Sequence, residues 1–243
     1  RRLSAASRPL IVAGGGAIRS ATAIRALAER LDAPVVMTVN ARGVVPGDHQ
    51  LAVHLSGESP AVTELLKDSD AILALGTELG PTDFGDSLPK DGRLSGWLAR
   101  VDVDPEQLMR GLQADLPVLG DANRTAEAVL QHLPEGRKAG AGHNLASVAR
   151  REVASSMNSV LTAGLHMLDT LAEAFPDAFI VGDSTQPVYA GCTAFGAMKP
   201  GSFFCSATGF GTLGYALPAA IGAAIGAGDR PVFGVIGDGV NPP

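Results

Sequence analysis

The chain of 243 residues has little cysteine, little charge and no long apolar run. Its two cysteines, Cys192 and Cys205, are too few for a disulfide framework, and their spacing matches no zinc motif. A cytoplasmic location is therefore the default expectation. Glycine and proline interrupt every apolar stretch before it reaches the ~20 residues of a membrane span, so we expect no membrane association.

Charged residues make up only 18% of the chain, and acidic residues outnumber basic ones by 25 to 19. The resulting formal net charge of −6 argues against nucleic acid as a partner. Soluble proteins typically carry about 25% charged residues, so the shortage indicates that part of the surface is buried against another surface. Hydrophobic residues reach 46%, which is enough for the cores of one large or two small domains.

The first 133 residues alternate short apolar segments with amphipathic patterns. Strands are predicted over 9–13, 34–39, 71–75, 98–103 and 116–119, and helices over 20–31, 59–67, 105–110 and 122–132. This alternation is typical of an α/β fold with a doubly wound parallel sheet, which we assign to a first domain over 1–133. Ser59 and Asp104 are expected to cap the helices that begin with Pro60 and Pro105.

Three consecutive glycines, Gly14–Gly16, join the first predicted strand to the first predicted helix. A turn of this kind can hold a pyrophosphate at the helix N-terminus. The segment departs from the GxGxxG pattern, because Arg19 occupies the place of the third glycine. A tight turn is therefore favoured, and a nucleotide site is the alternative.

The segment 134–144 combines glycine, proline and charge without an apolar period. We place a linker over 134–160, with a helix expected over 145–157, and a second parallel α/β domain over 161–243. In that second domain the pattern predicts helices over 163–175, 187–195 and 216–227, and strands over 179–181 and 231–236.

The last predicted strand ends at Gly237-Asp238-Gly239. Ligands of parallel sheets bind outside the carboxyl ends of the strands, so Asp238 is expected at a binding edge. Its carboxylate suits Mg²⁺, and Gly237 and Gly239 let the backbone come close to a phosphate. An ordinary Asp-Gly turn is the alternative.

Two further motifs precede this turn, GDSTQ at 182–186 and GFGTLGYALPAAIGA at 209–223. Together with VIGDG at 235–239, they resemble the thiamine-diphosphate-dependent 2-oxo acid enzymes, such as acetolactate synthase, benzoylformate decarboxylase and pyruvate oxidase. The first half of the chain resembles the central domain of this family, and the second half resembles the beginning of its diphosphate-binding domain.

The resemblance implies thiamine diphosphate and Mg²⁺ as cofactors, with Asp238 as the metal ligand. Cofactor contacts are implied for Ser184, Thr185, Gln186, Gly211, Thr212, Leu213, Gly237 and Gly239. Leu213 matches the bulky apolar residue that holds the bound cofactor in a bent shape, and a core leucine is the alternative.

FAD is not expected, although acetolactate synthases bind it in the central domain. Gly57-Glu58-Ser59 and Glu78–Gly85 stand where those enzymes carry their FAD-associated segments, and both differ from the pattern. The resemblance is greatest to decarboxylases of 2-oxo acids derived from basic amino acids, such as 5-guanidino-2-oxopentanoate, acting as homodimers or homotetramers. An acetolactate synthase-like carboligase and a non-catalytic nucleotide-binding or structural α/β module are the alternatives.

No catalytic residue is assigned in this chain. The catalytic glutamate of the family belongs to an N-terminal domain that would precede the first domain here. The second metal ligand of the family is an asparagine a couple of dozen residues beyond the GDG turn, and Asn241 is too close to Asp238 to serve. Because Mg²⁺ requires near-octahedral oxygen ligation, we expect the isolated chain to be a fragment that binds thiamine diphosphate weakly and is inactive.

Overall fold

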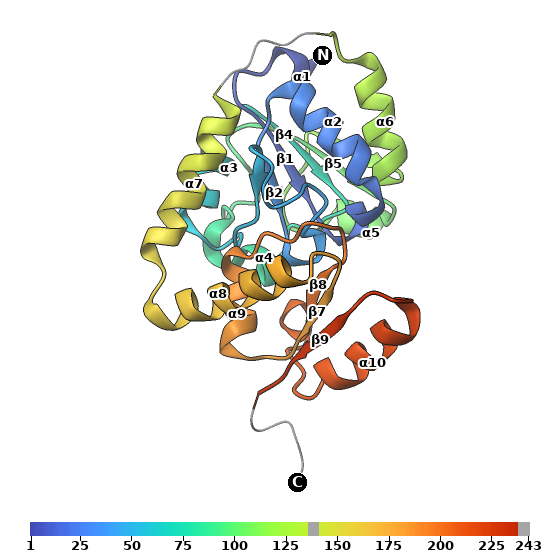
Figure 1. Cartoon of the computed structure of the whole chain (residues 1–243). Coiled ribbons are helices and arrows are strands. Elements are labelled where there is room, and N and C mark those ends of the chain that lie inside the picture. The colour runs from blue at the N-terminus through green and yellow to red at the C-terminus, as the bar shows by residue number, and fades with distance from the viewer. Residues whose placement is uncertain (136–140, 238–243) are drawn as a thin grey trace.

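The computed structural model describes residues 1–135 and 141–237. Its larger unit is built on a parallel sheet of six strands in the order β3-β2-β1-β4-β5-β6 (Figure 1). The strands are β1 (Pro9–Ala13), β2 (Val35–Met37), β3 (Ala52–Val53), β4 (Ala71–Leu75), β5 (Trp97–Asp102) and β6 (Leu116–Leu119). The strand order reverses between β1 and β4, which confirms the doubly wound α/β fold.

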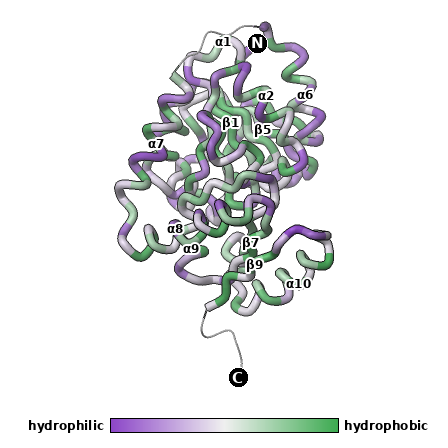
Figure 2. Tube along the Cα trace, viewed as in Figure 1, coloured by the Kyte–Doolittle hydropathy of each residue, from purple (hydrophilic) through white to green (hydrophobic). Residues whose placement is uncertain are grey.

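Helices cover both faces of this sheet (Figure 1). One face carries α2 (Ala21–Leu31) and α6 (Ala122–His132), and the other carries α3 (Pro60–Asp68) and α7 (Gly142–Ser156). Strand β1 is buried on both sides and is therefore apolar throughout, as Figure 2 shows for the interior of this unit. The connections contain the short helices α1 (Arg2–Ala5), α4 (Pro81–Phe84) and α5 (Pro105–Leu108).

The expected helix caps are confirmed. The Ser59 hydroxyl accepts a hydrogen bond from the backbone N–H of Val62 at 3.2 Å, and the Asp104 carboxylate accepts one from the N–H of Glu106 at 2.8 Å. Each cap satisfies a backbone donor that the first turn of a helix leaves without a partner.

The glycine segment after β1 is a tight connection that continues as a 3-10 helix over Gly15–Ser20. The N–H groups of Gly14 and Gly16 donate to the carbonyls of Leu75 and Gly76, each at 3.0 Å. A Cβ atom on Gly14 would come within 2.3 Å of the Gly76 carbonyl oxygen, so only glycine permits this approach. Two of the amide groups that a pyrophosphate would need are thus used inside the fold.

The helix expected over 145–157 is α7, and it belongs to the packing of the first sheet. Ala146, Ala149 and Val153 are buried in the core that α7 shares with α3. The N–H of Gly142 donates to the Asp32 carboxylate at 3.1 Å. From Gly142 onward, the connection between the two units is therefore a helix that packs on the first unit. The domain limits given above remain a prediction.

The smaller unit contains a parallel sheet in the order β8-β7-β9 (Figure 1). Its strands are β7 (Phe179–Gly182), β8 (Phe203–Cys205) and β9 (Val232–Val235), and its helices are α8 (Ser159–Ala174), α9 (Gln186–Ala194) and α10 (Ala216–Gly226). Leu168, Val188 and Phe203 are central members of its core. Strands β3 and β8 were not predicted, because two or three residues carry no periodic signal.

The two units meet backbone to backbone along the segments that follow β2 and β3. The N–H of Gly47 donates to the Ala197 carbonyl at 3.1 Å, and the N–H of Ser56 donates to the Thr193 carbonyl at 2.8 Å. Gly43 has φ +84°, and a Cβ atom there would lie 2.2 Å from the Lys199 carbonyl oxygen. The loop after β2 is thus part of the contact between the units.

The structure describes helices within residues 1–135 and 141–237. None of them combines the length and the apolar character needed to cross a bilayer.

Candidate cofactor edge and adjoining pocket

The predicted cofactor motifs meet at one edge of the small sheet. Since β7, β8 and β9 are parallel, the segments that follow them emerge on the same side. Ser184, after β7, places its hydroxyl 3.0 Å from the Ser206 hydroxyl and donates to the Gly211 carbonyl at 3.3 Å. A Cβ atom on Gly237, after β9, would lie 3.3 Å from the Thr185 methyl group. Residues from all three motifs are thus brought together.

Asp183 holds this edge in place, a role that the sequence argument missed. Its side chain is fully buried at the end of β7. One carboxylate oxygen accepts from the N–H of Ser184 at 2.9 Å, and the other accepts from Gly214 at 2.8 Å and Ala216 at 3.4 Å. A carboxylate close to the first turn of α10 is also favoured by the helix dipole. In the sequence, the only indication of this role was the position of Asp183 between a buried strand and a small polar turn.

The edge presents unused polar and apolar groups. The hydroxyl of Thr185 is buried and has no hydrogen-bond partner within the described chain. A Cβ atom on Gly209 would meet nothing within 4 Å, so the backbone there faces open space. Leu213 is 70% exposed within the described chain. A buried orphan hydroxyl, open glycine backbone and an exposed leucine are features that a phosphate-bearing heteroaromatic cofactor would fit.

The other predicted contacts lie at the same edge, within the limits of the described residues. Gln186 is the exposed first residue of α9, where N–H groups are free to meet an anion, and Thr212 is exposed beside Leu213. Asp238 and Gly239 lie outside the described residues, so the metal ligand remains a prediction. Strand β9 ends at Val235 on the side where that turn was expected.

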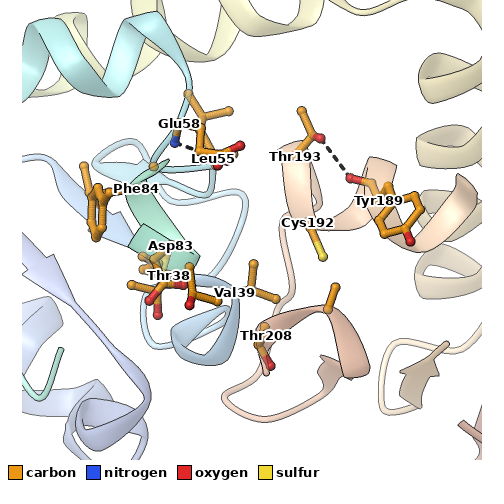
Figure 3. Close-up of a pocket in the computed structure, with 16 residues that line it drawn as sticks. Thr38, Val39, Leu55, Glu58, Asp83, Phe84, Tyr189, Cys192, Thr193 and Thr208 are labelled. Atoms are coloured by element: carbon orange, nitrogen blue, oxygen red, sulfur yellow. Dashed lines mark hydrogen bonds between the residues drawn. The ribbon is translucent and has the colours of Figure 1, made fainter. Parts of the chain in front are cut away.

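A cavity of about 240 Å³ adjoins this edge, between the two units (Figure 3). One side is formed by segments after β2 and β3 and by α4, and the other side by α9 and the turn after β8. Glu58 and Asp83 contribute carboxylates, whereas none of the lining residues that the structure describes is a lysine, arginine or histidine. From the sequence, Glu58 was interpreted as a departure from the FAD-binding pattern, and Asp83 was given no role of its own.

Burial raises the pKa of Asp83 to about 6, and the nearby Glu78 carboxylate adds to the shift while Arg42 opposes it. The folded chain therefore keeps this proton between pH 4 and 6, where the unfolded chain releases it. Stability conferred by the neutral acid is present below pH 4 and is lost as the pH rises through 6. A cleft carboxyl with such a shift is a candidate for ligand binding.

Asp83→Asn is expected to stabilise the chain by about 2 kcal/mol at pH 7.5 and to have no effect below pH 4, because asparagine stays neutral. Urea denaturation of both chains across pH 4–8 measures the difference. Asp86→Asn, at an exposed neighbour, serves as the control and should change little at any pH. A variant less stable than the parent at pH 7.5, or a pH-independent difference, would contradict the prediction.

Arg42 is the buried cation next to this cavity, and it ties the units together. It is 1% exposed, and its guanidinium donates to the carbonyls of His54, Phe195 (2.8 Å) and Cys192 (2.9 Å). Burial lowers the pKa of Arg42 to about 10, so it stays charged at neutral pH. Burial and the Arg42 charge lower the pKa of His54 to about 3, which keeps that ring neutral.

Comparisons with known proteins agree with this arrangement. Residues 1–132 match the model of the thiamine pyrophosphate enzyme central domain, and residues 183–240 match that of the C-terminal TPP binding domain. Thiamine pyrophosphate is another name for thiamine diphosphate.

Three relatives illustrate the range of named activities. The chain is 40% identical over 241 residues to "Probable 2-ketoarginine decarboxylase AruI" of Pseudomonas aeruginosa, covering 98% of this chain and 42% of the relative. It is 32% identical over 276 residues to a sulfoacetaldehyde acetyltransferase of Castellaniella defragrans (98% and 45%). It is 28% identical over 242 residues to the large subunit of acetolactate synthase isozyme 1 of Escherichia coli (98% and 42%).

The chain thus spans less than half the length of the curated relatives it matches. The central-domain model alone covers more than half of this chain, and the second model covers the cofactor edge described above. The chain belongs to the family of thiamine pyrophosphate enzymes.

Proposed function

We propose that this chain forms part of a thiamine-diphosphate- and Mg²⁺-dependent enzyme that decarboxylates a 2-oxo acid with a cationic side chain, such as 5-guanidino-2-oxopentanoate. The observation that carries the proposal is the meeting of the motif residues at one sheet edge, beside a cavity that holds two carboxylates. The name of the Pseudomonas relative supports the same substrate class.

The residues of the edge fit the cofactor. Ser184, Thr185 and Gln186 would hold the diphosphate, with Asp238 as a ligand of its metal ion and the backbone of Gly237 and Gly239 beside it. The aminopyrimidine would lie against Gly211, Thr212 and Leu213, the last of which is exposed as this contact requires. When bound, thiamine diphosphate supplies an electron sink for breaking the bond between a carboxylate and a keto carbon.

The cavity fits the side-chain end of the substrate. Glu58 and Asp83 would face a guanidinium group, which carboxylates bind through charge-assisted hydrogen bonds. Thr208 lines the same cavity and stands one residue before Gly209, so the cavity and the cofactor edge are continuous along the chain. Arg42 donates to carbonyls through both terminal nitrogens and lies outside the cavity lining.

The same proposal includes a homo-oligomer without FAD. Leu217, Ile221 and Ile225 lie on one face of α10 and are exposed, at 47%, 55% and 82%. Apolar side chains at i, i+4 and i+8 form a stripe suited to packing against another protein surface. In a chain that spans less than half the length of its relatives, the remainder of the polypeptide or a second copy would cover this stripe, and the homo-oligomer is proposed from the family resemblance.

A chimaera tests the proposal. This chain replaces the matching segment of the Pseudomonas relative, and CO₂ release from 5-guanidino-2-oxopentanoate and from 2-oxohexanoate is measured with and without thiamine diphosphate and Mg²⁺. We expect cofactor-dependent release that favours the guanidino acid by about tenfold or more, on the scale of one charge-assisted contact.

The matched variant Glu58→Gln should raise KM for the guanidino acid and leave KM for 2-oxohexanoate unchanged. Acetolactate formation from pyruvate would favour the carboligase alternative. A folded chimaera with no cofactor-dependent CO₂ release, while the parent relative is active, would overturn the proposal.

A further inference from the structure

The two cysteines of the chain face each other in the smaller unit, although sequence spacing gave them no role. Cys192 in α9 and Cys205 at the end of β8 place their sulfur atoms 3.5 Å apart. Both are free thiols. Cys205 is buried, at 4% exposed, whereas Cys192 is half-buried and lines the cavity between the units (Figure 3). One sulfur is thus reachable and the other is held behind it.

The surroundings of the pair favour one negative charge. The thiol of Cys192 donates toward Cys205, and this lowers the pKa of Cys205, as do the backbone N–H groups of Ala207 and Thr208 and the cation of Arg42. The pKa of Cys192 is raised, because its proton is held by Cys205 and because it is buried. The pair therefore shares a single proton, as neighbouring groups with coupled titrations do. A thiolate next to a buried guanidinium is the reactive form of cysteine.

We propose that Cys192 and Cys205 form a site of reversible oxidation, which a hydroperoxide converts into an intramolecular disulfide. As Cys192 passes the shared proton to Cys205, its sulfur, on the cavity side of the pair, attacks one oxygen of the hydroperoxide, the O–O bond breaks, and the leaving alkoxide or hydroxide takes up a proton from solvent. Cys192 becomes a sulfenic acid. The Cys205 sulfur then attacks the Cys192 sulfur, the S–O bond breaks, and water leaves with the remaining thiol proton. Overall, the two cysteine sulfurs lose two electrons to form the disulfide, and these electrons reduce one peroxide.

Formation of the bond requires only a small local movement. The sulfur atoms must approach from 3.5 Å to about 2.05 Å, which displacement of two side chains can supply. The bridge would fasten the end of β8 to α9, directly before Ser206, whose hydroxyl contacts Ser184. Oxidation would therefore restrain the backbone just before the 206–216 segment, whatever ligand that segment binds.

The test uses the reduced 243-residue chain and one equivalent of hydrogen peroxide. Since the chain has only two cysteines, the intact mass should fall by 2 Da, and both thiols should resist alkylation by N-ethylmaleimide until dithiothreitol is added. The same reaction is run in 8 M urea, where the sulfurs are no longer held together. We expect the folded chain to form the bridge at least tenfold faster.

Cys192→Ser and Cys205→Ser provide matched controls, and neither should lose 2 Da. In Cys205→Ser the sulfenic acid should persist and be trapped by dimedone at Cys192. Three results would overturn the proposal: equal or slower bridge formation in the folded chain, oxidation to sulfinic acid without loss of 2 Da, or disulfide-linked dimers as the main product.

Discussion

Replacing Arg42 with alanine is expected to remove about 4 kcal/mol or more from the free energy of unfolding and to separate the unfolding of the two units. Three carbonyl groups, from His54, Phe195 and Cys192, would lose a charged donor in a buried place. Each hydrogen bond to a charged group contributes about 1.5–3 kcal/mol, and removal of one partner leaves the other unsatisfied. Urea denaturation followed by circular dichroism measures the loss.

The acceptors explain why the effect reaches beyond stability. His54 belongs to the first unit, whereas Phe195 and Cys192 belong to the second, so one side chain joins both backbones. Without it, the contact keeps loop hydrogen bonds such as that between Gly47 and Ala197 and the apolar packing of Val39 on the second core. We expect two unfolding transitions in the variant where the parent shows one.

Arg100→Ala is the matched control. Arg100 is also 1% exposed and donates to three carbonyls, of Arg110 (2.6 Å), Leu112 (2.9 Å) and Glu78 (3.1 Å), all within the first unit. Its loss should cost a similar free energy and leave a single transition. If Arg42→Ala unfolds like Arg100→Ala, or costs less than about 1 kcal/mol, Arg42 does not join the units as described.

Local sequence patterns correctly predicted the helices and strands that are long enough to show a clear apolar period. The strand over 9–13 and the helix over 122–132 have the predicted limits, because each is long enough for its apolar period and its flanking turn residues to agree. The parallel arrangement also follows from the sequence. It brings Ser184 and Gly211 to the same edge although 27 residues separate them.

The roles of Arg42 and Asp183 could not be predicted in the same way. Arg42 lies in a stretch rich in turn formers, which indicates an exposed loop, and its burial depends on Phe195, 153 residues away. Asp183 lies in a polar turn, where a carboxylate is expected to face solvent, yet it turns inward to the amides of Gly214 and Ala216. Both are buried polar groups whose partners come from distant segments, so no periodic pattern marks them.

Replacing Asp183 with alanine is expected to release the 206–216 segment and to cost about 3 kcal/mol of stability. The side chain accepts from three backbone N–H groups in a site without solvent access, and alanine would leave all three unsatisfied. Hydrogen exchange of the Gly214 and Ala216 amides measures the release directly. We expect exchange to accelerate by about 100-fold. In the variant, these amides can exchange without first breaking hydrogen bonds to the Asp183 carboxylate.

Asp183→Asn keeps the volume of the side chain but removes its charge and one of its two acceptor oxygens. An asparagine keeps one acceptor oxygen, so either Ser184 or the Gly214–Ala216 pair loses its bond, while packing is preserved. Its exchange rates should fall between those of the parent and the alanine variant. Asp104→Ala, which removes an exposed cap with one N–H partner, should cost about 1 kcal/mol and leave the Gly214 amide protected.

Thiamine diphosphate binding by the chimaera gives the second readout of Asp183. If the edge is the cofactor site, Asp183→Ala should weaken binding by at least tenfold, because the segment that carries Gly211 and the exposed Leu213 would no longer be held opposite Ser184. Faster exchange with unchanged cofactor affinity would leave Asp183 as a structural residue and place the cofactor elsewhere. Unchanged exchange would contradict the role of Asp183 as the acceptor that protects those amides.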